Sequence, residues 1–334
     1  MHAWRLHKPA PIEEHPLKLE ELPVPVPQVH EVLIKIQVCA LCRTDLHIAE
    51  GDIELPLLPI TPGHQVVGVI EQVGQGVTVR KIGERVGVPW LYETCGHCEF
   101  CISDQENLCD SGKFTGQHAQ GGFAEYMTAP AEFVYPLPAS FTNLQAAPLL
   151  CSGVIGYRSL KLTDVPPRGK LGIYGFGSSA HITMQIALAG GAECYVITRG
   201  TAGQQHARKL GAQWAGGPTD TPPVLLDSII IFAPAGELVP LSLTHLKKGG
   251  CITCAGIHMT DIPQFPYHDL WGERRIRSVA NSTRDDVREL LQIAAELQLQ
   301  PDVTEFDFGH LNEHLLALKQ GKFVGTGVVH IANA

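Results

Sequence analysis

The sequence lacks the features that would place the protein in a membrane or on nucleic acid. No apolar run reaches the roughly 18 residues that a membrane-spanning helix needs. The first residues, MHAWRLHKPAPIEEH, include acidic side chains and no apolar segment typical of a signal peptide. The net charge is −9 and no block of basic residues occurs. We therefore expect no nucleic-acid partner, no membrane partner and a cytoplasmic location.

Internal repeats and low-complexity segments are also missing. Charged residues make up only 18% of the chain, against 44% hydrophobic residues, which is an ordinary composition for a soluble enzyme. A length of 334 residues is enough for about two domains, each with its own hydrophobic core.

Cysteine is scarce and unevenly placed. The chain has ten cysteines, and four of them fall in the stretch CGHCEFCISDQENLC, residues 95–109. In a reducing cytoplasm, clustered cysteines are metal ligands or redox groups more often than disulfides. The stretch therefore indicates a metal site, and the isolated Cys42 and Cys151 need a separate explanation.

Two patterns of hydrophobicity divide the chain. Short alternating runs, such as 31–38 and 66–74, predict an irregular, mostly β domain over the first ~150 residues. Further along, apolar strands alternate with helix-like segments and predict a parallel α/β sheet, with strands at 171–175, 194–198, 228–232 and 251–257. An amphipathic helix near residue 285 leads to another alternating run at 322–332, so we expect the C-terminal segment to rejoin the β domain.

A glycine-rich loop follows the first strand of the α/β region. YGFGSSAH, residues 174–181, gives the pattern G-x-G-x-x-A with Gly175, Gly177 and Ala180. Glycines at these points allow the backbone to approach a pyrophosphate at the positive end of the next helix. The pattern alone is weak, but its position after a strand and before a helix indicates a dinucleotide site.

The next strand ends without the carboxylate that an NAD site usually places there. An Asp or Glu would accept a hydrogen bond from the ribose 2′-hydroxyl, whereas this strand ends in Thr198 and Arg199. A guanidinium can form a charge-assisted pair with a 2′-phosphate. We therefore predict a preference for NADP(H); the alternative is that Arg199 is a solvated loop cation.

Several motifs in order carry a family resemblance. CRTDLH (42–47), PGHQVVG (62–68), GVTVRKIGERV (76–86), the four-cysteine stretch, GGFAEY (121–126), APLLCSGV (147–154) and the nucleotide loop occur along nearly the whole chain. The sequence resembles the zinc-dependent alcohol dehydrogenase branch of the medium-chain dehydrogenase/reductase family. The resemblance implies a GroES-like β catalytic domain over 1–150 and 286–334, and a Rossmann domain with a doubly wound parallel sheet over 151–285.

The resemblance also implies two zinc ions per chain. The catalytic zinc would be held by Cys42, His64 and Cys151, the ligand set of this branch, with an open fourth position. The structural zinc would be held by the four clustered cysteines, Cys95, Cys98, Cys101 and Cys109. Two thiolates and one neutral imidazole leave the catalytic site formally neutral and Lewis acidic enough to polarise a carbonyl.

Each metal assignment has an alternative. Cys151 could be a buried apolar side chain, and His64 a turn histidine. The four clustered cysteines could hold an iron–sulfur cluster, although Asp110 follows the last one where bacterial ferredoxins have proline. Cys39 lies three residues before Cys42, and in an extended strand the two would face apart. The same argument excludes a metal site at residues 251–254.

Other residues acquire roles from the resemblance. Thr44 would contact the substrate oxygen and pass its proton, through a cofactor hydroxyl, to His47 and solvent. Asp45 would orient the ring of His64, and Arg43 would contact the cofactor pyrophosphate. Two departures stand out: Gln65 replaces the usual glutamate, and residues 324–329, VGTGVV, lack a common cofactor-binding arginine.

The sequence thus predicts a zinc-dependent oxidoreductase that transfers hydride between NADP(H) and an alcohol or aldehyde. A polyol dehydrogenase or another alcohol dehydrogenase that uses NAD, and a non-catalytic cofactor-binding relative, are the alternatives. Members of the family commonly form homodimers or homotetramers, so we expect one of these states. Residues 90–92 could line the substrate pocket or could be ordinary core.

Overall fold

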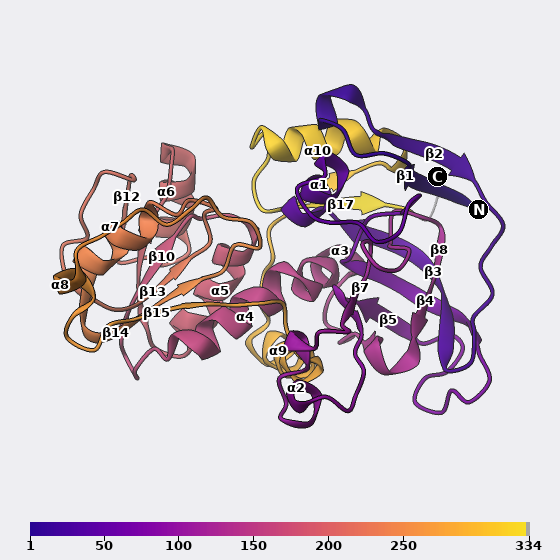
Figure 1. The fold of residues 1–334 in the computed structure, drawn as a ribbon, viewed down its shortest axis with the longest axis horizontal. Coiled ribbons are helices and arrows are strands. Elements are labelled where there is room, and N and C mark those ends of the chain that lie inside the picture. Colours follow the sequence, from indigo (N-terminus) through magenta and orange to yellow (C-terminus); the bar gives the residue numbers. More distant parts are fainter. Residues whose placement is uncertain (332–334) are drawn as a thin grey trace. The chain divides into compact units, whose positions relative to one another are not determined.

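A computed structural model describes residues 1–331 of the chain. It contains two compact units: Met1–Cys151 together with the segment from Asn281 onward, and Ser152–Ala280. Figure 1 shows both units. The chain changes unit after residues 151 and 280, where we had placed the domain boundaries after 150 and 285. Within the described part of the chain, every helix is too short or too polar to span a lipid bilayer.

The first unit is built on a seven-stranded sheet. Its order is β16-β17-β3-β4-β5-β9, and β8 also pairs with β3. The strands are β3 (Glu31–Ala40), β4 (Val66–Val73), β5 (Arg85–Val88), β8 (Tyr126–Pro130), β9 (Tyr135–Pro136), β16 (Val303–Phe306) and β17 (Thr326–His330). All pairings are antiparallel except that of β16 with β17.

Strand β3 is the centre of this sheet. Its first half pairs with β8 and its last residues pair with β17, with Cys39 opposite Val329. Irregularities in its register with β4 lie between Leu33 and Ile34 and between Ile36 and Val38. Such bulges bend a strand and increase its twist. Because β17 pairs with β3, the C-terminal segment completes the sheet of the first unit.

Two short hairpins and the helices of the first unit surround the sheet. The hairpins are β1 (His2–Leu6) with β2 (Leu17–Glu21), and β6 (Leu91–Glu93) with β7 (Lys113–Phe114). The helices are α1 (Arg43–Glu50), α2 (Glu99–Ile102), α3 (Asn143–Ala146), α9 (Arg284–Leu297) and α10 (Leu311–Lys319), with short 3-10 turns η1 (Ile12–Glu14), η2 (Glu106–Leu108), η3 (Ala131–Phe133), η4 (Ala147–Leu150) and η5 (Phe308–His310).

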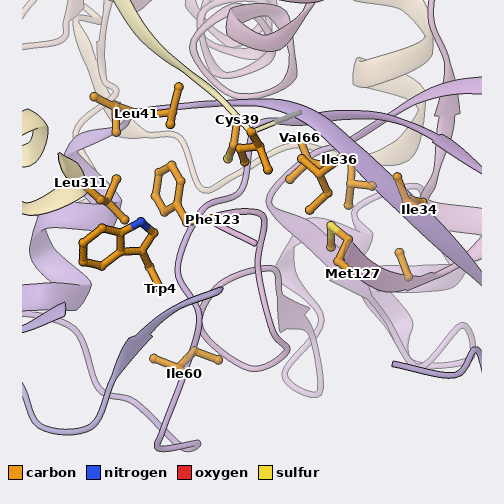
Figure 2. Close-up of a cluster of buried hydrophobic side chains, with 14 of the residues drawn as sticks. Trp4, Ile34, Ile36, Cys39, Leu41, Ile60, Val66, Phe123, Met127 and Leu311 are labelled. Atoms are coloured by element: carbon orange, nitrogen blue, oxygen red, sulfur yellow. The ribbon is translucent and has the colours of Figure 1, made fainter. Parts of the chain in front are cut away.

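The core of the first unit joins residues that are far apart in the sequence. Figure 2 shows Trp4, Phe123 and Leu311 in one cluster with side chains of β3 and β4. The indole Nε1 of Trp4 donates to the carbonyl oxygen of Phe308 at 2.8 Å, so the polar edge of this ring is also satisfied. The C-terminal segment is therefore part of the same core as the N-terminus.

The second unit is a six-stranded, fully parallel sheet in the order β12-β11-β10-β13-β14-β15. Numbered within the unit, this is the order 3-2-1-4-5-6 of the Rossmann fold, whose ligand crevice lies where the order reverses, here at β10 and β13. The strands are β10 (Lys170–Tyr174), β11 (Glu193–Ile197), β12 (Trp214–Gly216), β13 (Leu226–Ile231), β14 (Leu246–Cys254) and β15 (Arg275–Ser278).

Helices cover both faces of this parallel sheet. On one face, Ile173 and Val196 pack with Ala180 and Met184; on the other face, alternate strand residues pack with Val239 and Leu243 of α7, and with other side chains. Strands buried on both faces become continuous apolar runs, as the sequence shows. The helices are α4 (Ser152–Thr163), α5 (Ser178–Ala189), α6 (Thr201–Lys209), α7 (Leu238–His245) and α8 (Tyr267–Leu270). The prediction of a β domain plus a Rossmann domain is confirmed.

Candidate catalytic metal centre and cofactor site

Cys42 lies where β3 gives way to α1. Its backbone is extended, with φ −134° and ψ 158°, and it precedes the first helical residue, Arg43. Its backbone N–H donates to Asp45 Oδ2 at 2.9 Å, which ties the turn to the first turn of the helix. The thiol is therefore held at a helix N-terminus, where the partial positive charge favours a thiolate.

Asp45 and His64 form a fully buried pair. Asp45 Oδ1 is 2.9 Å from His64 Nδ1, and it also accepts the backbone N–H of Gly63 at 3.1 Å. Because a carboxylate only accepts, Nδ1 donates to Asp45, and Nε2 is the ring atom left to bind a metal ion. His64 Nε2 is buried and has no hydrogen-bond partner. The imidazole thus presents one unused donor atom toward a ligand such as a metal ion.

Gly63 is required by the local geometry. Its φ is +100°, and a Cβ atom there would lie 2.8 Å from the backbone nitrogen of Phe123. Any side chain would have to displace the segment that packs beside His64. The Gly-His pair in PGHQVVG is thus explained by backbone conformation and by close approach.

Cys151 completes the group. It follows η4, and its Sγ lies 3.9 Å from Sγ of Cys42. The donor atoms of Cys42, His64 and Cys151 all lie within 4.8 Å of one another. Two sulfurs held about 2.3 Å from one tetrahedral ion would be about 3.8 Å apart. The donor set therefore fits zinc and leaves one coordination position for another ligand.

The pKa values of Cys42, Cys151 and His64 are shifted because these groups lie close together. The Cys151 thiol donates toward the sulfur of Cys42, and together with His64 it holds the pKa of Cys42 well below the usual range; the same contact raises the pKa of Cys151. Burial lowers the pKa of His64, but Asp45 and the Cys42 thiolate outweigh burial and raise it to about 10. A metal ion must therefore displace protons when it binds here.

Thr44 and His47 occupy one side of α1, next to Cys42. Thr44 is buried, and its Oγ1 is 3.6 Å from Sγ of Cys42. His47, about one turn further along, is partly exposed, and its Nδ1 is 2.8 Å from Oδ2 of Asp52. The sequence analysis did not single out Asp52. Its position just after Gly51, the left-handed residue that ends α1, is the signal that could have revealed it.

Gln65 and Trp90 are the other polar groups beside His64. Gln65 is fully buried; its Nε2 donates to the carbonyl of Leu41 at 3.3 Å, and its Oε1 has no partner. The ring of Trp90 is centred 6.1 Å from that of His64 and stacks on Phe114 at 4.6 Å. Leu91 is buried in β6. Of residues 90–92, Trp90 is thus the one whose ring contacts the donor set, through His64.

The four clustered cysteines form a second donor set, which we call the lobe site: Cys95, Cys98, Cys101 and Cys109. Their sulfur atoms all lie within 4.8 Å of one another. Sγ of Cys101 is 3.9 Å from that of Cys95 and 3.5 Å from that of Cys98. Backbone N–H groups of His97 and Cys98 lower the pKa of Cys95 to about 6. Four thiolate donors can close a tetrahedron around one ion.

Cys39 stays apart from both sets, for a different reason from the one we expected. We placed Cys39 and Cys42 in one extended strand, but β3 ends at Ala40 and Cys42 begins a helix, so alternation along a strand does not separate them. Cys39 is fully buried in the core. A Cβ atom at Gly63 would lie 3.0 Å from its Sγ, which shows how tightly this thiol is packed.

The glycine loop of the second unit lies at the carboxyl end of β10. Gly175 has φ +88°, and a Cβ atom there would lie 2.7 Å from the backbone nitrogen of Ala233. Gly177 precedes α5, and a Cβ atom there would meet nothing within 4 Å. Ala180 is fully buried against the sheet. The loop therefore turns sharply and leaves open space at the N-terminus of a twelve-residue helix.

Thr198 and Arg199 follow the neighbouring strand at the same edge of the sheet. Ile197 is opposite Tyr174 in the parallel pairing of β10 and β11, and the N–H of Gly175 donates to the carbonyl of Ile197 at 2.8 Å. Thr198 is buried, and its N–H donates to Gly216 at 3.0 Å. Arg199 is exposed. The end of β11 thus carries the exposed Arg199 next to the glycine loop, and residues 198 and 199 include no carboxylate.

Arg43, the remaining predicted residue, is the first residue of α1 and is exposed. Residues 324 and 325 precede β17, where the backbone of Gly325 has φ +75°. A Cβ atom at Gly325 would lie 2.2 Å from the carbonyl oxygen of Asp302. An arginine at this position would therefore be excluded by the turn itself.

Comparisons with known proteins agree with this geometry. The family model of the alcohol dehydrogenase GroES-like domain matches residues 28–139. A Mycobacterium tuberculosis protein described as a probable alcohol dehydrogenase is 44% identical over 99% of this chain and 97% of its own length. An alcohol dehydrogenase of Geobacillus stearothermophilus is 35% identical over 95% of this chain and 96% of its own.

A solved structure gives the same result. The cinnamyl alcohol dehydrogenase of Sorghum bicolor superimposes with a TM-score of 0.90 at 28% identity, covering 100% of this chain and 98% of the sorghum chain. The chain described here belongs to the zinc-type alcohol dehydrogenases of the medium-chain dehydrogenase/reductase family.

Proposed function

We propose that this protein is a zinc-dependent alcohol dehydrogenase or aldehyde reductase that prefers NADP(H). The observation that carries the proposal is the donor set of Cys42, His64 and Cys151, with Asp45 fixing the tautomer of the histidine. Three protein donors leave a coordination position for a substrate, whereas the lobe site has four donors and serves the fold. In its zinc form the chain would hold two ions.

The chain's own residues prepare the catalytic site. When bound, zinc supplies a Lewis acid that polarises the C–O group of the substrate. Cys42 and Cys151 supply two negative charges and neutral His64 none, so the ion's charge is balanced. Asp45, buried and hydrogen-bonded to the Gly63 amide, keeps the imidazole ring oriented and raises its basicity.

Thr44 and His47 provide the route for the proton. An alcohol must lose a proton when its hydride leaves, and an aldehyde must gain one. Thr44 is buried next to the donor set, while His47, one turn along α1, is 14% exposed and so reaches solvent. Asp52 is 2.8 Å from Nδ1 of His47 and orients its ring. A cofactor hydroxyl would join the two residues when the cofactor is bound.

The second unit would bind the nicotinamide cofactor, which supplies or accepts the hydride. Gly175, Gly177 and Ala180 form the loop for the pyrophosphate at the N-terminus of α5, and Arg43 would add a cation to it. Arg199, exposed beside this loop, would pair with the 2′-phosphate of NADP(H).

Trp90 and Phe114 would form a wall of the substrate site. Their stacked rings lie beside His64, so a flat apolar substituent on the substrate could pack against them. This favours aromatic or unsaturated alcohols and aldehydes over strongly polar polyols.

The proposal is tested by aldehyde reduction, followed through the absorbance of the reduced nicotinamide. The zinc-loaded protein is assayed with NADPH and with NADH over linear, branched and aromatic aldehydes. We expect turnover, with a higher kcat/KM for NADPH and for aromatic substrates. Absence of turnover in protein with its full zinc content would refute the enzymatic proposal and favour a cofactor-binding relative.

The cofactor assignment has its own test. Arg199→Asp removes a charge-assisted bond and introduces repulsion, so kcat/KM for NADPH should fall roughly 10- to 100-fold relative to that for NADH. Arg168→Asp, an exposed arginine in the loop before β10, serves as the control for the change of charge. Equal changes with both cofactors in Arg199→Asp would remove Arg199 from the phosphate site.

A further inference from the structure

Glu106 joins the lobe site to the start of α9. It lies in η2, between the donors Cys101 and Cys109, and is only 6% exposed. Its Oε1 accepts the backbone N–H of Arg284 at 2.8 Å and Nε of Arg284 at 3.0 Å, and its Oε2 accepts Nη2 at 2.8 Å. Both carboxylate oxygens therefore bind a residue that is 178 positions away in the sequence.

The contact between Glu106 and Arg284 adds to the interactions that fix the N-terminus of α9. Thr283 already caps the helix through the N–H of Asp286, and the carboxylate of Glu106 adds a negative charge at the positive end of the helix. The guanidinium of Arg284 also lies over the ring of buried Phe133, 4.9 Å from its centroid. Bidentate, charge-assisted bonds of this kind are among the stronger ones in proteins.

The Glu106–Arg284 ion pair affects the pKa of Arg284 and lines a small pocket. Hydrogen bonding to Glu106 raises the pKa of Arg284. A small polar cavity of about 150 Å³ is lined by Glu106, Arg284 and Cys101, one of the lobe donors, among others. Cys101 of the lobe site and the first turn of α9 thus line the same pocket.

Helix α9 continues this connection toward the catalytic donor set. The helix packs against η4, the buried turn Ala147–Leu150 that directly precedes Cys151. Leu149 and Leu150 are fully buried, so the backbone leading to Cys151 has little freedom of its own. Helix α9 is therefore one of the elements, together with α3 and strands β3, β4, β5 and β17, that pack against the turn before Cys151.

We propose that Glu106 is a positioning residue that transmits the order of the lobe site, through Arg284 and α9, to the metal ligand Cys151. The inference rests on the proposed function for the metal content of the two sites. In this proposal the lobe orders more than its own loop. An ordered lobe holds η4 in place, and η4 holds the Cys151 thiol close to Cys42 and His64.

Amide hydrogen exchange on the full-length, zinc-loaded protein tests this. Glu106→Gln keeps the size of the side chain and removes its charge. We expect faster exchange in the first turn of α9 and in residues 147–151, and unchanged exchange in α1. Labelling of Cys151 by an alkylating reagent in the presence of a chelator should accelerate roughly 2- to 30-fold. Arg284→Gln should reproduce both changes.

The matched control is Glu99→Gln, which removes the same charge from an exposed position of the lobe, between Cys98 and Cys101. It should leave all these rates at their wild-type values. Faster exchange in α9 with wild-type exchange at 147–151 would overturn the proposal and make Glu106 a local staple only. Equal acceleration in α1 would also overturn it, because that pattern signals general destabilisation.

Failure of the proposed function gives a different result. Protein that takes up zinc at the lobe but not at Cys42, His64 and Cys151 would refute the catalytic metal site, yet the exchange rates at 147–151 would still show whether Glu106 orders that turn.

Discussion

The first unit contains two sets of sulfur donors that are assembled in opposite ways. The lobe site takes its donors from one short stretch, whose end cysteines are only 14 positions apart, and three of its four cysteines are partly exposed. The catalytic set takes Cys42 and Cys151 from positions 109 apart and adds a fully buried His64. The lobe site is local in sequence and has the four donors of a tetrahedral site. The catalytic set is long-range in sequence and has three donors.

This difference separates the two uses of a metal. A local set of four donors can close around an ion before the rest of the unit is folded, and its ion stabilises a loop that has little core of its own. A set gathered from three segments requires the finished unit, and under the proposed function its missing donor would be the place where a substrate binds.

The largest effect should come from Cys42→Ser. Losing a thiolate from the three-donor set should reduce kcat at least about a thousandfold, because metal-assisted polarisation contributes several kcal/mol, while cofactor binding to the second unit persists. Stopped-flow turnover and cofactor titration measure the two quantities. Cys39→Ala, in a buried cysteine outside both sets, is the control and should retain activity. Wild-type turnover in Cys42→Ser would contradict the metal assignment.

A smaller loss is expected when Asp45 becomes asparagine. The amide can still accept one hydrogen bond but no longer balances the His64 ring with a charge, so zinc affinity at the catalytic set should fall roughly 10- to 100-fold. Zinc content after dialysis against graded chelator measures this. The lobe site should keep its zinc, and equal loss from both sets would show that Asp45 acts on overall folding.

The two sets should also differ in their response to pH. In the metal-free protein the pKa of His64 is raised to about 10, so its pairing with Asp45 stabilises the fold below the usual histidine pKa and is lost as the pH rises toward 10. Zinc must displace that proton. Its apparent affinity for the catalytic set should therefore rise about tenfold per pH unit for each proton released.

Cobalt titrations between pH 6 and pH 9, a window of roughly three units that lies below the pKa of His64, can measure how metal affinity depends on pH. The absorption of a thiolate-and-imidazole site differs from that of a four-thiolate site, so uptake by each set is resolved. A flat profile for the catalytic set would mean that metal binding displaces no proton from either His64 or Cys151, against the raised pKa of both groups.

The smallest effect on turnover should come from Cys98→Ser in the lobe. With zinc supplied in the buffer, kcat should fall no more than roughly 30-fold, because the lobe acts on Cys151 only through Arg284 and α9, while the unfolding temperature falls by roughly 5–10 °C. Calorimetry and steady-state kinetics measure the two. A thousandfold loss of kcat without a loss of stability would assign chemistry to the lobe and abolish the distinction between the two sets.

Much of the fold was predictable because each strand carries its own pattern. The parallel sheet was indicated by apolar runs between helical segments, and the predicted β domain and Rossmann domain are confirmed by the observed sheets and the family comparison. The lobe site was predictable because its donors are neighbours in the sequence. The family resemblance, rather than spacing, supplied the grouping of Cys42, His64 and Cys151.

Other features depend on packing that a sequence does not display. The partnership of Glu106 with Arg284 spans 178 positions, and the four-cysteine stretch that contains Glu106 gives no sign of a distant partner. The place of Trp90 beside His64 depends on its stacking on Phe114, which is 24 positions further along the chain. The separation of Cys39 from Cys42 was predicted for the wrong reason, because the strand ends between them and the next residues start a helix.

The pairing of β17 with β3 has a consequence for the order of events on the ribosome. The central strand of the first unit, β3, emerges before the second unit, but its partner at residues 326–330 is made after the whole second unit. The parallel sheet of residues 152–280 can therefore finish folding first, before β17 is available to pair with β3. A nascent chain truncated before residue 326 should hold a folded second unit beside an incomplete β sheet.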